Sequence, residues 1–125
     1  RVALEIREHG YVRDYFNRIR WFPGIYSPDR RLKAAADREA VNMTIQGPAA
    51  SLTKLGLQKA EREMKEMGLE AHFLLPIHDE VVFEVLDDHV PDAAAILAGM
   101  SDGLFPVSMP VEIKVGKNLG IMEDM

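Results

Sequence analysis

The sequence predicts an α+β fold built around an antiparallel layer of strands, and three observations support this. A helical pattern runs from about Arg31 to Gly68. Apolar, β-branched and aromatic runs then fill residues 72–86 on either side of His78-Asp79-Glu80, as in a β-hairpin. Residues 111–115 alternate between apolar and charged side chains, which predicts a final strand. A helix, two strands, a further helix and a strand together favour helices packed on an antiparallel sheet.

The first thirty residues predict a helix end and a small hairpin. Residues 1–9 form the last turns of a helix, and Gly10 suits the position just past its end. Residues 11–14 and 18–21 then form two short strands that turn at Phe16-Asn17. Pro23-Gly24 and residues 27–29 mark a loop.

The long helical pattern contains Gly47-Pro48, where we expect a bend or a break. In its second half, apolar residues recur at helical spacing, which predicts a face turned toward the core rather than a functional site. These residues are Leu52, Leu55, Ala60, Met64 and Met67. After the hairpin, an Ala-rich segment from Asp88 to Leu104 predicts a helix beginning near Pro91.

Bulk properties indicate one globular domain. The chain has 125 residues, of which 47% are hydrophobic and 28% charged, and it contains no Cys. Disulfides and thiolate metal sites are therefore excluded, and a reducing compartment is expected. No apolar stretch reaches the roughly 20 residues of a membrane helix. The sequence begins with Arg1, so we expect a processed, split or trimmed piece.

Charge is distributed unevenly along the chain. Residues 1–38 carry nine Arg or Lys against five acids, whereas residues 39–125 carry six against fifteen. A basic N-terminal part and an acidic C-terminal part fit a protein that binds a polyanion on one side of its surface. Ordinary solvated charges explain the distribution equally well.

His78, Asp79 and Glu80 at the predicted hairpin tip favour metal-assisted chemistry. Carboxylates suit Mg²⁺, and two such ions can activate an attacking hydroxyl and stabilise a leaving pyrophosphate. A second Asp must come from a neighbouring strand, but no apolar strand before residue 72 ends in one. Taken alone, such a triplet is more often a solvated turn.

Arg38, Asn42 and Gln46 are spaced four residues apart, which places them within an arc of roughly 80° on one helix face. All three can donate hydrogen bonds, and donors suit the minor groove, where every base pair presents acceptors. Taken alone, these three residues fit an exposed polar face better. Arg30, Arg31 and Lys33 precede them and suit backbone phosphates, although surface solvation explains them equally well.

Taken together, these segments resemble the C-terminal end of family A DNA polymerases, the bacterial DNA polymerase I type. Residues 37–50 (DREAVNMTIQGPAA) resemble the family's (E/D)R-x-x-x-N-x-x-x-Q-G-x-A-A segment, and residues 77–84 (IHDEVVFE) resemble its motif C. Gly10-Tyr11-Val12, residues 18–23 and residues 115–118 also match in order. Related single-subunit RNA polymerases tend to carry Ser where Glu80 stands, which favours the DNA enzyme.

The resemblance implies a role for each site residue. Asp79 is expected to bind the catalytic Mg²⁺ ions, with Glu80 as an auxiliary acid and His78 near the primer terminus. Arg38, Asn42 and Gln46 are expected to contact the minor groove. The implied partners are primer-template DNA and deoxynucleoside triphosphates, without a membrane. The implied compartment is the cytoplasm of a bacterial or phage-infected cell. Residues 1–30 correspond to the end of a fingers-side helix and a hairpin, and residues 31–125 to the palm, with its antiparallel sheet covered by helices on one face.

Three departures qualify the resemblance. Pro48 replaces the family's usual Thr, and Leu119 replaces its usual Trp. The family's motif A, which carries the other metal-binding Asp, and its fingers helix have no counterpart in these residues. We therefore expect the lone chain to be inactive and to need the remaining palm and fingers. The missing motif A strand should pair beside the 72–86 hairpin, so apolar surface should be exposed there.

Two alternatives remain open at this stage. One is a non-catalytic nucleic-acid-binding or clamp-like module that retains the palm fold. The other is a small self-associating α+β domain in which His78-Asp79-Glu80 is an ordinary turn.

Overall fold

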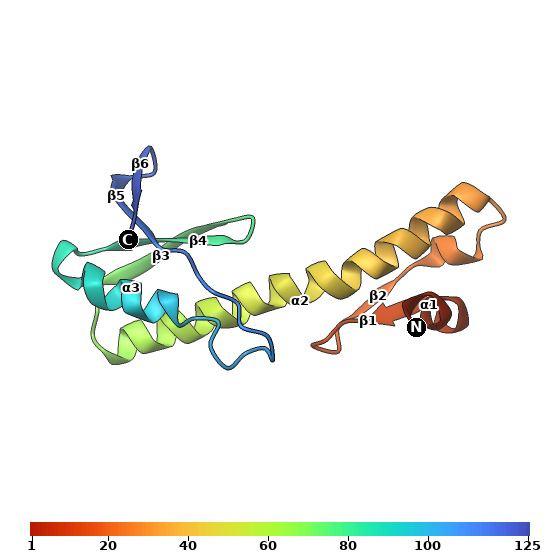
Figure 1. The fold of residues 1–125 in the computed structure, drawn as a ribbon, viewed down its shortest axis with the longest axis horizontal. Coiled ribbons are helices and arrows are strands. Elements are labelled where there is room, and N and C mark those ends of the chain that lie inside the picture. Colours follow the sequence, from red (N-terminus) through yellow and green to blue (C-terminus); the bar gives the residue numbers. More distant parts are fainter. The chain divides into compact units, whose positions relative to one another are not determined.

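The computed structural model describes residues 1–125 and has the predicted α+β architecture (Figure 1). Its strands form three antiparallel hairpins, each paired only within itself. The chain divides into two compact units, residues 1–51 and residues 52–125. No helix combines the length and the apolar character that crossing a bilayer requires.

The first unit begins as the sequence predicts. Helix α1 (Val2–His9) ends at Gly10, whose φ of 73° is left-handed and whose N–H bonds to the Ile6 carbonyl at 2.8 Å. Strands β1 (Tyr11–Arg13) and β2 (Ile19–Trp21) then form the hairpin, with Asn17 at a φ of 63°. The predicted loop contains a short 3-10 helix, η1 (Pro23–Tyr26).

The core of the first unit lies between this hairpin, α1, η1 and the first half of helix α2 (Arg30–Glu66). Its buried members are Ile6, Val12, Phe22, Ile25, Ala36 and Ala40. Because strand side chains alternate, Val12 faces this core while its neighbours Tyr11 and Arg13 point to the other face of the hairpin.

Asp14 closes the hairpin loop from a buried position, with only 7% of the residue exposed. Its Oδ1 accepts hydrogen bonds from the backbone N–H groups of Phe16 and Arg18, both at 2.9 Å. The Arg18 guanidinium donates to Ser51 Oγ at 2.9 Å, which ties the loop to α2. A Cβ on Gly47 would lie 3.0 Å from Asp14 Oδ2, so glycine permits this close approach.

Helix α2 (Arg30–Glu66) begins at Asp29, whose Oδ1 accepts the Arg31 N–H at 2.8 Å as an N-cap. The helix continues through Pro48, so the predicted break there is wrong. Proline removes the N–H that would bond the Thr44 carbonyl, at a cost of about 3 kcal/mol. Pro48 is itself buried and the helix packs into a core on either side of it, which offsets this loss.

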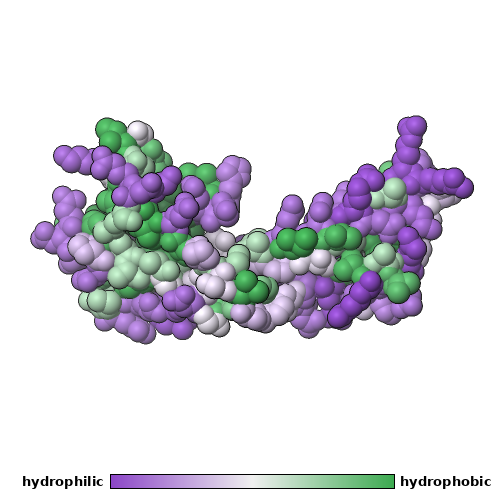
Figure 2. Space-filling view, viewed as in Figure 1, coloured by the Kyte–Doolittle hydropathy of each residue, from purple (hydrophilic) through white to green (hydrophobic).

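The second unit packs a hairpin and a helix against the second half of α2. Strands β3 (Ala71–Ile77) and β4 (Glu80–Val85) pair with a register shift between Phe73 and Leu75. Val81, Phe83 and Val85 face the core, which contains the following buried residues: Ala60, Met64, Ala93, Ile96 and Met100. Leu74, Leu75 and Ile77 of β3 are exposed, so apolar surface is present at this hairpin as expected, and Figure 2 shows apolar residues on the molecular surface.

The predicted apolar stripe is confirmed in part. Leu52, Ala60 and Met64 are buried, whereas Leu55 and Met67 are exposed. Met67 lies beyond the helix end, just before Gly68 with its φ of 69°. At this point of the helix, Gly56 rather than Leu55 faces the core. Met100 packs so close to Gly56 that a side chain there would overlap it.

Two C-terminal boundaries differ from the prediction. Short helix η2 (Asp87–His89) precedes α3 (Val90–Ala98), which carries Pro91 in its first turn but ends six residues before Leu104. It ends because the chain turns at Gly99 and buries Met100.

The expected strand at 111–115 overlaps β5 (Lys114–Asn118), which pairs with an unpredicted strand, β6 (Ile121–Asp124). The Ile121 carbonyl oxygen occupies the space of a Gly116 side chain, so only glycine allows this pairing. The alternation of residues 111–115 reflects the half-buried Val111 and Ile113, which lie outside a strand.

Asp14 generates a stability prediction. Asp14→Ala leaves two loop amides without their acceptor, so we expect a loss of about 1–3 kcal/mol in unfolding free energy. Urea unfolding followed by the fluorescence of Trp21, the only tryptophan, measures this. Glu39→Ala is the control, because its ion pair with Arg20 spans 3.9 Å between exposed side chains and should contribute less than about 1 kcal/mol. Equal stability of Asp14→Ala and the unmodified chain would contradict the assigned role.

Candidate metal and nucleic-acid site

The turn between β3 and β4 presents the predicted acidic tip. Ile77 pairs with Glu80, so His78 and Asp79 form a two-residue loop. Two-residue hairpin loops require positive φ to match the twist of the strands, and glycine usually supplies it. Here His78 adopts a φ of 54°. A left-handed histidine is uncommon and costs about 1–3 kcal/mol, which points to a functional constraint at this turn.

The Asp79 and Glu80 carboxylates are exposed and engaged by no ion pair within the chain. Glu80 opens β4 on the face of the strand opposite Val81, which packs toward the core. Both carboxylates are therefore held at the end of a rigid hairpin with their oxygens free. Such oxygens are the ligands that Mg²⁺ prefers.

No group of three or more His, Asp or Glu side chains in this chain is arranged to hold a metal ion. The tip offers the two adjacent carboxylates of Asp79 and Glu80. Asp14 also follows a strand, but its Oδ1 already accepts two backbone amides of its own hairpin loop.

Arg38, Asn42 and Gln46 are all exposed on the first half of α2. Ala36 and Ala40, on the buried face, each precede one of these donors by two residues, a rotation of about 200°. The three donors therefore project from the face opposite the core. The acids beside Arg38 have other partners, since Asp37 pairs with Arg7 at 3.3 Å and Glu39 with Arg20 at 3.9 Å.

Arg31 and Lys33 are exposed on the first turn of α2. The backbone N–H of Arg31 donates to the Asp29 cap. Asp29 therefore binds the main chain of Arg31, and the guanidinium stays available for a ligand. These two residues and the three donors belong to the first unit, and His78, Asp79 and Glu80 belong to the second. The structure thus groups the predicted residues into two sets, each on its own rigid element.

Sequence reasoning missed Asp14 as the organiser of the first hairpin. A signal was present, since an Asp two residues before a turn often accepts the backbone N–H two positions on. The sequence instead predicted Asp14 as the last residue of a strand, because a strand this short does not show which of its flanking residues is buried.

Comparisons with known proteins agree on one family. The model of the family described as DNA polymerase family A matches residues 1–121. The thermostable DNA polymerase I of Thermus filiformis is 39% identical over 116 residues, covering 93% of this chain and 14% of that protein. The DNA polymerase I of Chloroflexus aurantiacus is 37% identical over 115 residues, covering 90% of this chain and 12% of that protein.

A solved structure is similar as well. The POL domain of Pol1 from M. smegmatis, in complex with DNA primer-template and dNTP, superposes with a TM-score of 0.80 and 30% sequence identity. The match covers 87% of this chain and 19% of that chain. These 125 residues thus span about one-seventh of the length of the curated relative from Thermus filiformis.

Proposed function

Because the chain belongs to DNA polymerase family A, we propose that it forms the C-terminal palm segment of a template-directed DNA polymerase. Residues 1–30 would be the end of a fingers-side helix and its hairpin, and residues 31–125 would be palm. The observation that carries the proposal is the exposed Asp79-Glu80 pair on a two-residue turn, within a chain that matches the family over residues 1–121.

Asp79 would hold Mg²⁺, and Glu80 would serve as an auxiliary acid beside it. Their fit to the metal rests on hard oxygen donors that are exposed and free of ion pairs. When bound, the ions supply Lewis-acid activation of a primer 3′-hydroxyl and charge stabilisation at the α-phosphate of a deoxynucleoside triphosphate. The hairpin keeps both carboxylates on a rigid element. His78, in the same turn, would lie near the primer terminus.

The donor row on α2 would contact the minor groove of primer-template DNA. Arg38, Asn42 and Gln46 offer hydrogen-bond donors at one-turn spacing, which suits acceptors common to all correct base pairs. Such contacts sense the shape of a base pair without reading its sequence. Arg31 and Lys33 would bind backbone phosphates. The M. smegmatis structure, which contains primer-template DNA and dNTP, supports these partners.

The second metal-binding carboxylate would come from residues outside these 125, in the remaining palm and fingers. The proposal therefore requires either another polypeptide or a longer parent protein. The alternative of a non-catalytic nucleic-acid-binding module differs in one respect: it would bind DNA without ever completing a metal site.

The 125-residue chain alone should not extend a primer. We expect no product with primed template, Mg²⁺ and deoxynucleoside triphosphates, since Asp79 and Glu80 provide only part of a two-metal site. A gel-based extension assay measures this, and a complete polymerase is the positive control. Robust extension by the lone chain would contradict the proposal that this chain provides only part of the metal site.

In an enzyme reconstituted with the remaining palm and fingers, Asp79→Ala should reduce the extension rate by roughly 10³-fold or more. The reason is that metal ions contribute several kcal/mol to transition-state stabilisation. DNA affinity, measured by fluorescence anisotropy, should change little. Glu84→Ala is the matched control, an exposed acid on the same strand and face as Glu80. Full activity of the Asp79 variant would refute the metal assignment, and loss of activity in both variants would point to damage to the hairpin.

Gln46→Ala in the same reconstituted enzyme should raise the KM for primer-template, or weaken mismatch discrimination, by roughly 2- to 10-fold. One hydrogen bond contributes about 0.5–1.5 kcal/mol. Gln58→Ala, an exposed glutamine on the same helix, provides the comparison and should behave as the unmodified enzyme. An effect limited to the melting temperature would instead indicate a structural role for Gln46.

A further inference from the structure

The outer face of the β1–β2 hairpin carries a cluster of aromatic rings that neither the core nor the proposed site uses. Tyr11 and Trp21 are cross-strand partners in the register, so their side chains emerge on the same face. Their rings meet edge to face with centroids 4.9 Å apart. The His9 ring stacks on Tyr11 at 5.6 Å and 24°. With Arg13, these residues form what we term the aromatic platform.

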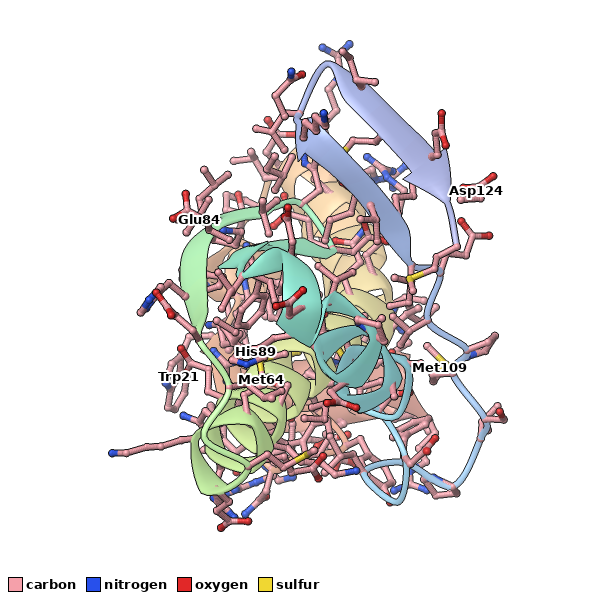
Figure 3. All side chains as sticks on the ribbon, turned by 90° about the vertical axis from the view of Figure 1, so that its left-hand side faces the viewer. Trp21, Met64, Glu84, His89, Met109 and Asp124 are labelled. Atoms are coloured by element: carbon pink, nitrogen blue, oxygen red, sulfur yellow. The ribbon has the colours of Figure 1, made fainter.

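The aromatic platform is open to solvent. Trp21 is 66% exposed, and Figure 3 shows its side chain projecting from the ribbon. Strand alternation explains the exposure, because Val12 between Tyr11 and Arg13 occupies the core-facing side. The rings are nevertheless held in fixed relation by the hairpin and by each other. A rigid, exposed aromatic surface of this kind provides a preformed stacking site.

Cationic groups accompany the rings. The Arg13 guanidinium lies 5.5 Å from the centroid of Tyr11 and donates to Asn17 Oδ1 at 2.9 Å, so it is held over the aromatic surface. The exposed Glu8 carboxylate lies 3.8 Å from His9 Nε2. The first unit as a whole is basic, with nine Arg or Lys against six acids.

Rings that offer stacking faces, next to a fixed guanidinium on a basic unit, match a ligand with flat unpaired bases and a phosphate backbone. We propose that the aromatic platform binds single-stranded nucleic acid, with bases stacked on Trp21 and Tyr11 and phosphate contacting Arg13. Duplex DNA fits poorly, because its base faces are already stacked within the helix. Binding would be tolerant of sequence, since every base has a π-face. The platform shares no residue with the Asp79 tip or the donor row, and it requires no metal.

Trp21 is the only tryptophan, so its fluorescence reports directly on the platform. Titrating the 125-residue chain with a dT oligonucleotide, without Mg²⁺, should quench this fluorescence saturably. Affinity should fall with salt, at a logarithmic slope of roughly 0.7 per phosphate contact. A blunt duplex of the same length should quench little. Unchanged fluorescence while a labelled oligonucleotide gains anisotropy would place binding elsewhere and overturn the proposal, and so would equal quenching by the duplex.

Variants test the individual residues, with labelled dT anisotropy as readout and circular dichroism as the folding check. Trp21→Leu and Tyr11→Leu should each weaken binding by roughly 5- to 100-fold, the range for one stacked base. Arg13→Gln should flatten the salt dependence. Tyr15→Leu, an exposed tyrosine at the tip of the same hairpin, should stay within about twofold. Equal losses for Tyr15→Leu and Trp21→Leu would refute the platform. Asp79→Asn should leave the quenching intact, so failure of the polymerase proposal and failure of this one can be told apart.

Discussion

Close packing against small residues of α2 is the constraint on which both units depend. In the first unit, Ala36 and Ala40 are buried, and the Asp14 carboxylate approaches the helix where Gly47 has no side chain. In the second unit, Ala60 is fully buried, and Met100 occupies the space beside Gly56. Larger residues at these positions would hold the β1–β2 hairpin or α3 away from α2. Protein interiors are closely packed and tolerate little displacement of this kind. The same packing orients the helix, because fixing its small face toward the core leaves Arg38, Asn42 and Gln46 on the opposite side.

The β3–β4 hairpin shows how local geometry can hold charged groups in place without burying them. Strand alternation directs Val81, Phe83 and Val85 into the core, so the strand is anchored by one face only. The tip then extends beyond the packed part, with His78 in a left-handed conformation that costs free energy. Packing of the strands stabilises this turn, while the acids themselves remain solvated and keep their ordinary hydration. A tip built in this way can exchange water for a cation without rearranging the fold.

Sequence reasoning succeeded where local chemistry decides structure and failed where contacts distant in sequence decide it. Gly10 at the end of α1 and the apolar runs around residues 77–84 act within a few residues, and these features were predicted. Backbone chemistry alone predicted a bend or a break at Pro48, but the helix continues because Pro48 is buried by residues far along the chain. The same holds for Met100, which lies just past the end of α3 and beside Gly56, a residue more than forty positions earlier in the sequence. Tyr11 and Trp21 are ten residues apart, and only the hairpin register brings their rings together.

The uneven charge of the two units bears on how a polyanion could approach. Residues 52–125 carry six bases against fourteen acids, whereas residues 1–51 carry nine against six. By charge alone, the second unit repels phosphate, and Asp79 and Glu80 add to that repulsion unless cations neutralise them as proposed. Attraction must therefore come mainly from the first unit, where Arg31, Lys33, Arg38 and Arg13 are exposed. Binding and chemistry would then respond differently to solution conditions. Added monovalent salt would weaken the proposed phosphate contacts of the basic residues, whereas removal of divalent cations would act on the proposed metal site at the acidic tip and leave those contacts in place.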